Sequence, residues 1–164
     1  MIRTFAILLA VVVISWSNPF QNLTAKQYSV FYKTWSKAKE FDLAYTMTAI
    51  AWQESRLGEY PLNLSDPSCG VFHVMPSTLT ENKWKQSRLC ERLVADYDFS
   101  FSVALQRFKY WYNYWKSKGC SSATAWKRAV CSYNAGYNWK KGLPYYRKIV
   151  TIIKQIKKFR QTLD

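Results

Sequence analysis

The feature that most restricts the fold is an apolar face that repeats at helical spacing through residues 99–118. The side chains on this face are Phe101, Ala104, Leu105, Phe108, Trp111, Tyr112 and Trp115. A helix with one wide apolar stripe must bury that stripe against other elements, so the segment predicts a core helix. A face that stacks ligands is the alternative for so many aromatic rings, and we favour the core.

Helical periodicity also marks most of the chain around this segment. We expect helices near 28–35, over 44–57 with Gly58 as its end, around 84–95, over 122–134, and from Pro144 onward. The last one alternates isoleucines with lysines and arginines, so we expect it to pack on the domain, with binding to a membrane surface as the alternative. Residues 59–75 predict a loop with short or irregular β structure. The sequence therefore predicts a single, mainly α domain.

The first residues are typical of an export signal. Arg3 precedes an apolar run over residues 5–16, and a small-residue site and the break Asn18-Pro19 follow it. The run is shorter than the roughly 20 apolar residues that a membrane span needs. We expect residues 1–17 to be a signal peptide and 18–164 to form an exported domain, periplasmic or extracellular. An uncleaved anchor that extends to Leu23 is the alternative.

The cysteines fit an oxidising compartment. They are Cys69, Cys90, Cys120 and Cys131. None belongs to a C-x-x-C pair and the chain has a single histidine, so we expect no metal site and no cofactor. Four cysteines allow three pairings, of which we favour the local one, Cys69 with Cys90 and Cys120 with Cys131.

The formal charge of +14 favours polyanionic partners. Aromatic residues make up 18% of the chain, and both bases and sugar rings stack on such side chains. Composition alone therefore does not choose the partner. Because an exported protein rarely meets nucleic acid, we expect contact with an anionic wall polymer or membrane and no nucleic-acid partner.

Three short segments carry polar residues where a core would not need them. They are Glu54-Ser55 before Gly58, Ser68-Cys69-Gly70-Val71-Phe72-His73-Val74-Met75-Pro76, and Ser132-Tyr133-Asn134-Ala135-Gly136. In order and spacing they resemble the Glu-Ser-x-x-Gly, Gly-x-x-Gln-x-x-Pro and Tyr-Asn-Ala-Gly pattern of the lysozyme-like lytic transglycosylases of the soluble lytic transglycosylase (SLT) superfamily. The resemblance spans about residues 40–146 and implies a lysozyme-like helical fold. Phage lysis enzymes, secretion-associated wall-opening factors and housekeeping wall enzymes could all share it.

Glu54 is the expected catalytic residue. Cleavage of a glycosidic bond requires a proton on the leaving oxygen. A carboxylic acid supplies that proton at neutral pH when apolar surroundings raise its pKa, and Glu54 ends an apolar helix in an aromatic-rich chain. The alternative is a surface glutamate paired with Arg56 or a lysine.

The resemblance also implies roles for residues around the acid. The expected substrate-binding residues are Ser55, Ser68, Gly70, His73, Met75, Tyr133 and Asn134. His73 stands where the family pattern has glutamine; both side chains can donate a hydrogen bond, and histidine adds sensitivity to pH. Tyr133 matches a tyrosine that lies beside the acid. Purely structural roles remain the alternative, a backbone contact for His73 and core packing for Met75.

The implied reaction is cleavage of the β-1,4 bond between N-acetylmuramic acid and N-acetylglucosamine in peptidoglycan glycan strands, with formation of 1,6-anhydromuramic acid by a monomeric enzyme. Hydrolytic glycosidases usually need two carboxylates, and Asp66 is the candidate for a second, although an Asp before Pro also suits a turn. Two alternatives remain. One is a hydrolytic muramidase on the same bond, and the other is a non-catalytic cationic protein that binds wall or membrane through residues 148–160.

Overall fold

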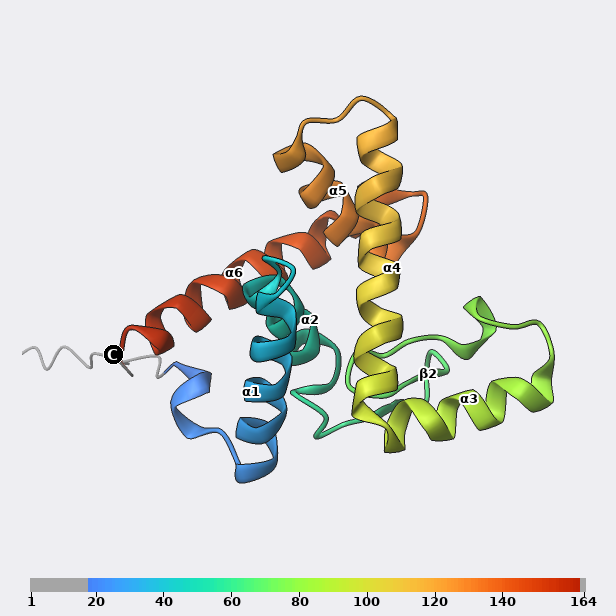
Figure 1. The fold of residues 1–164 in the computed structure, drawn as a ribbon, viewed down its shortest axis with the longest axis horizontal. Helices are drawn as coiled ribbons and strands as arrows, with labels where there is room; N and C mark the ends of the chain where they lie inside the picture. Colours follow the sequence, from blue (N-terminus) through green and yellow to red (C-terminus); the bar gives the residue numbers. More distant parts are fainter. Residues whose placement is uncertain (1–17, 163–164) are drawn as a thin grey trace, which may run out of the picture.

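Helices form most of the fold in the computed structural model, which describes residues 18–162 (Figure 1). They are α1 (Ala25–Lys39), α2 (Ala44–Ser55), α3 (Lys83–Ala95), α4 (Tyr97–Ser117), α5 (Ser122–Ala135) and α6 (Leu143–Arg160). The shorter elements are the 3-10 helices η1 (Pro19–Asn22), η2 (Pro76–Thr78) and η3 (Trp139–Gly142) and the strands β1 (Leu62–Asn63) and β2 (Ser68–Cys69). The expectation of a mainly α fold with a small β region after the second helix is confirmed. The predicted signal peptide or anchor lies outside the described residues.

Helix α2 forms the centre of the hydrophobic core. Nine of its 12 residues are buried, and the side chains of Met47 and Ile50 are fully enclosed. It packs against α1 and α6 (Figure 1). A helix that is buried on most of its sides is held in place by packing, so α2 gives Glu54 near its end a rigid support.

The long apolar face predicted over residues 99–118 lies on α4 and is buried. The helix begins at Tyr97, two residues before the predicted start, because the side chain of Asp96 caps it by accepting a hydrogen bond from the N–H of Phe99 at 2.9 Å. The buried residues of the face are Phe101, Ala104, Leu105, Phe108, Trp111 and Trp115. Only Tyr112 is half-buried. The interpretation as a core helix is confirmed.

Helix α6 has one apolar and one basic face, as predicted. The apolar face buries Ile149, Ile152, Ile156 and Phe159. The basic face exposes Lys148, Lys154, Lys157 and Lys158. The buried face covers α2 and α5, so the prediction that this helix packs on the domain is confirmed. Within residues 18–162, no helix is both long enough and apolar enough to cross a membrane.

The segment between α2 and α3 is fixed to its surroundings by a disulfide and by a close backbone contact. Its two strands pair antiparallel with Leu62 opposite Cys69, and Cys69 is bonded to Cys90 of α3. Gly70 has φ +82°, and a Cβ at this position would lie 2.4 Å from the carbonyl oxygen of Leu93. Only glycine allows this approach, so the sequence brings the loop directly onto α3.

The predicted disulfide between Cys120 and Cys131 is wrong. Both residues carry free thiols: Cys131 is buried within α5, and Cys120 lies in the turn before that helix. From Ser122 to Cys131 a helix rises about 14 Å at 1.5 Å per residue. Disulfide partners need Cα atoms within about 7 Å, so two cysteines at opposite ends of a helix cannot pair despite their short separation in sequence.

Candidate active site

Glu54 lies in the last turn of α2, where the chain turns sharply. After Ser55, three residues have a left-handed backbone conformation: φ is 53° at Arg56, 59° at Leu57 and 81° at Gly58. The helix therefore ends at Ser55, before the Gly58 predicted to end it. Two consecutive non-glycine residues in this region are costly and need support from their surroundings. The buried hydroxyl of Ser55 gives it, donating to the carbonyl of Val71 at 2.6 Å and accepting from the N–H of Gly58 at 2.7 Å.

Tyr145 of α6 is the direct partner of the acid. Its hydroxyl donates a hydrogen bond to Oε1 of Glu54 at 2.5 Å, and the residue is buried. Burial first, and then the negative charge of Glu54, hold the pKa of Tyr145 well above its ordinary value, so the phenol remains a donor at any working pH. Tyr145 is not among the residues predicted from the sequence. The signal in the sequence was a hydroxyl on the otherwise apolar face that continues with Ile149 and Ile152.

The surroundings of Glu54 make it a weak acid. Burial raises the pKa of its carboxyl from 4.5 to about 7. The hydrogen bond from Tyr145 and the charge of Arg107 lower the pKa, and the charge of Asp66 raises it, but burial is the largest effect. About 16% of the side chain remains exposed. Glu54 is therefore substantially protonated at neutral pH and accessible enough to pass on its proton.

His73 faces the other oxygen of the same carboxyl. Its Nδ1 lies 3.6 Å from Oε2 of Glu54, and its Nε2 lies 2.8 Å from the carbonyl oxygen of Tyr60. A carbonyl only accepts, so Nε2 donates to Tyr60, and Nδ1 is the ring nitrogen that faces Glu54. With φ 43°, the backbone of His73 is left-handed as well. The backbone contact that was the alternative for His73 is therefore present, the other nitrogen faces the acid, and contact with the substrate stays a prediction.

Tyr133 lies near the acid but binds elsewhere. Its buried hydroxyl donates to the carbonyl of Phe72 at 3.1 Å. Burial first, and then the charge of Glu54, raise the pKa of Tyr133 above its ordinary value. The motif tyrosine therefore ties the end of α5 to the 68–76 segment, and Tyr145 supplies the hydrogen bond to the carboxyl.

The other residues predicted to bind substrate or to act as a second carboxylate differ in how far they are exposed. Ser55, Ser68 and Gly70 are buried, so the expectation that they contact a substrate is not supported. Gly70 in particular approaches the backbone of α3, so the space left by its missing side chain is occupied within the fold. Met75 is half-buried and Asn134 exposed. Asp66 is exposed on the loop and close enough to affect the pKa of Glu54.

A hollow of about 410 Å³ opens beside this group and was not predicted. Its lining comes from η2, α4 and the turn after α5: Val74, Thr78, Leu79, Val103, Gln106, Arg107, Tyr110, Trp111 and Tyr137. The hydroxyls of Tyr110 and Tyr137 lie 2.8 Å apart, and both rings are more than half exposed. Arg107 lines this hollow, and its positive charge lowers the pKa of Glu54, so the hollow and the acid share this residue.

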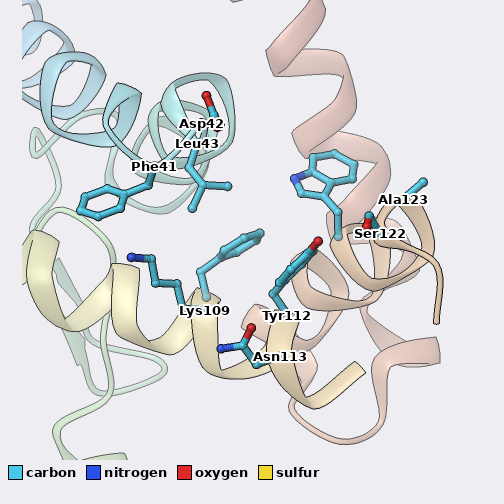
Figure 2. A pocket seen from close by; sticks show the side chains of 10 residues that line it. Phe41, Asp42, Leu43, Lys109, Tyr112, Asn113, Ser122 and Ala123 are labelled. Atoms are coloured by element: carbon cyan, nitrogen blue, oxygen red, sulfur yellow. The ribbon is translucent and has the colours of Figure 1, made fainter. Parts of the chain in front are cut away.

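A separate hollow of about 670 Å³ lies at the opposite end of α2 (Figure 2). Phe41 and Leu43, which precede the helix, face Lys109 and Tyr112 of α4 across it. Glu54 is about 16 Å away along the helix, at 1.5 Å per residue from Leu43. This hollow is therefore not part of the acid site. Among the described residues no group of three or more His, Cys, Asp or Glu side chains is placed to hold a metal ion.

Comparison with known proteins gives one match. A family model described as the transglycosylase SLT domain matches residues 32–147, which is more than half of the chain. No curated protein and no solved structure matches the chain. The matched range contains Glu54, His73, Tyr133 and Tyr145.

Proposed function

Because the chain belongs to the family of transglycosylase SLT domains, we propose that Glu54 cleaves the β-1,4 bond between N-acetylmuramic acid and N-acetylglucosamine in peptidoglycan. Membership of the family carries a peptidoglycan-cleaving function of the lytic transglycosylase type in general terms. The choice of Glu54 rests on one observation. Its partly exposed carboxyl has a pKa raised to about 7 and lies between Tyr145 and His73.

The two oxygens of Glu54 have different surroundings, which suits proton transfer in both directions. Oε1 accepts from Tyr145, so Oε2 is the oxygen that carries the proton to the leaving glycosidic oxygen. As the bond between C1 and the leaving oxygen breaks, the carbonyl oxygen of the muramoyl N-acetyl group bonds to C1. The resulting carboxylate of Glu54, stabilised by Tyr145, then takes the proton of the C6 hydroxyl. At the same time the hydroxyl oxygen bonds to C1 and displaces the N-acetyl oxygen, which closes the 1,6-anhydro ring and restores both the N-acetyl group and the acid.

Hydrolysis of the same bond is the second candidate, and exposed Asp66 is the observation in its favour. A second carboxylate near the acid could activate a water molecule, as in hydrolytic glycosidases. The charge of Asp66 raises the pKa of Glu54, which is the effect expected of a second carboxylate in the site.

Export is part of the proposal. The disulfide between Cys69 and Cys90 suits an oxidising compartment. The formal charge of +14 would accelerate encounter with the anionic wall and hold the enzyme there, and salt would weaken both effects.

Mass spectrometry of the fragments released from purified peptidoglycan tests the proposal. We expect products one water lighter than hydrolysis fragments from the wild-type protein and none from Glu54→Gln. Glu91→Gln is the matched control, because Glu91 is exposed on α3. Ordinary reducing ends would establish the muramidase and make Asp66→Asn the next variant. Release by neither protein from several walls would favour the cationic binder.

A further inference from the structure

Most N–H donors of the Arg107 guanidinium, on α4, have no hydrogen-bond partner among the described residues. Its guanidinium lies over the ring of Tyr133, 5.5 Å from the centroid, and Nη1 lies 3.4 Å from the hydroxyl of Thr78. Its Nε is buried and has no hydrogen-bond partner among the described residues. None of the salt bridges in residues 18–162 includes Arg107.

This arrangement is costly unless an anion completes it. A guanidinium carries five N–H donors in a planar fork, and here one long contact to a hydroxyl accounts for a single donor. A partly desolvated charge without a counter-charge destabilises the folded protein. Two coplanar oxygens, as in a carboxylate, match the fork and would satisfy two donors at once.

The neighbouring hollow is suited to a sugar ring. Tyr110 and Tyr137 expose 51% and 63% of their surface, and the hydrogen bond between their hydroxyls holds the two rings in place. Exposed aromatic faces fixed in this way pack against the C–H faces of sugars. Arg107 lines the same hollow, and its positive charge lowers the pKa of Glu54.

We propose that Arg107 binds a carboxylate of the glycan substrate while the hollow between Tyr110 and Tyr137 receives the sugar that carries it. Two groups of peptidoglycan have this chemistry, the lactyl carboxylate of a stem-free muramoyl residue and the carboxylates of a peptide stem. The inference rests on the proposed function for its substrate class. It adds a binding residue that selects for charge, distinct from the acid that breaks the bond.

The test compares glycan strands that differ in the carboxylates they carry: stem-free strands with lactyl carboxylates, the same strands with those carboxylates converted to methylamides, and strands with intact stems. Arg107→Gln should raise KM about tenfold or more on the strands whose carboxylate it binds, from the loss of a charge-assisted pair. The methylamide strands should be cleaved equally by both proteins. Arg107→Lys should recover part of the loss, because a lysine keeps the charge without the planar fork.

Controls separate the inference from misfolding and from failure of the proposed function. Arg88→Gln removes an arginine from the exposed face of α3 and should change no KM. Calorimetric titration of the same strands into Glu54→Gln, with and without Arg107→Gln, measures binding without turnover. A loss confined to stem-free strands or to stem-bearing strands identifies the carboxylate. An equal loss on all three strands, or none, overturns the inference. If the wild-type protein cleaves nothing, the proposed function fails, and the titration still decides whether Arg107 binds carboxylates.

Discussion

Glu54 is contacted from two regions that hold it in different ways. On the α6 side, Tyr145 reaches one carboxyl oxygen directly from a helix whose apolar face covers the core. On the loop side, formed by residues 59–75, most contacts fix the backbone: Ser55 to Val71, Tyr133 to Phe72, and Cys69 to Cys90. The helical region therefore adjusts the chemistry of the acid, whereas the loop region sets its position. Changes on the α6 side should therefore reduce turnover, and changes on the loop side should reduce stability.

Replacement of the acid itself should give the largest effect and the reference for both regions. Glu54→Gln should lower kcat by about 10²–10⁴-fold, the usual contribution of a general acid. Wild-type activity should fall as the pH rises through about 7, where Glu54 loses its proton. A pH profile that is flat across this range would contradict the assignment.

The same variant should be more stable than the wild type at alkaline pH. A carboxyl whose pKa is raised from 4.5 to about 7 on folding contributes stability below pH 4.5, and this contribution is lost as the pH rises through about 7. Glutamine does not ionise, so Glu54→Gln should gain up to about 3 kcal/mol over the wild type at pH 8 and little at pH 4. Urea unfolding at the two pH values measures the difference, and an equal effect at both would exclude a raised pKa.

The loop side should respond to loss of its disulfide with a loss of stability. Replacing both Cys69 and Cys90 with serine removes a cross-link over 21 residues and should cost about 3 kcal/mol. Thermal unfolding measures this loss, and reduction of the wild-type protein should reproduce it. Cys120→Ser is the control. Because Cys120 is a free thiol, this substitution should lower Tm little. Turnover per folded molecule should stay near that of the wild type.

The two tyrosines provide the sharpest comparison between the regions. Tyr145→Phe removes the donor to the carboxylate that forms on proton transfer, so we expect kcat to fall about tenfold or more. Because that bond lowers the pKa of Glu54, its loss should shift the alkaline limb of the activity profile to higher pH. An unchanged limb would show that Tyr145 does not influence the acid.

Tyr133→Phe should give the opposite pattern. It leaves the carbonyl of Phe72 without its donor and should cost about 1 kcal/mol of stability. The effect on kcat should be within a few-fold, measured beside Tyr145→Phe at a temperature where both variants are folded. Should the order of the two kcat values reverse, the motif tyrosine would be the direct partner of the acid after all.

Local patterns in the sequence predicted the features that neighbouring residues determine, namely the positions of helices and which helices are buried. Apolar periodicity placed α4 and α5 within about two residues, and burial of a whole helix around Glu54 followed from its composition. Tyr145 and Arg107 could not be found in this way, since they reach the acid across the fold; the Tyr145 contact spans 91 residues. The predicted pairing of Cys120 with Cys131 was wrong for a related reason: residues that are close in sequence lie far apart in space when a helix separates them.

His73 faces the carboxyl from the loop side, and its replacement should give the smallest effect on turnover. Its Nδ1 lies 3.6 Å from Oε2 of Glu54, beyond ordinary hydrogen-bonding distance, whereas its Nε2 donates to the carbonyl of Tyr60 at 2.8 Å. Glutamine also carries a hydrogen-bond donor, so His73→Gln can keep the bond to Tyr60 while it loses the ring nitrogen that faces Glu54. We therefore expect kcat to stay within about two- to threefold of the wild type, and a loss of stability of about 1 kcal/mol or less. A loss of kcat as large as that of Tyr145→Phe would mean that His73 acts on the acid directly, and the loop side would then contribute to the chemistry as well as to position.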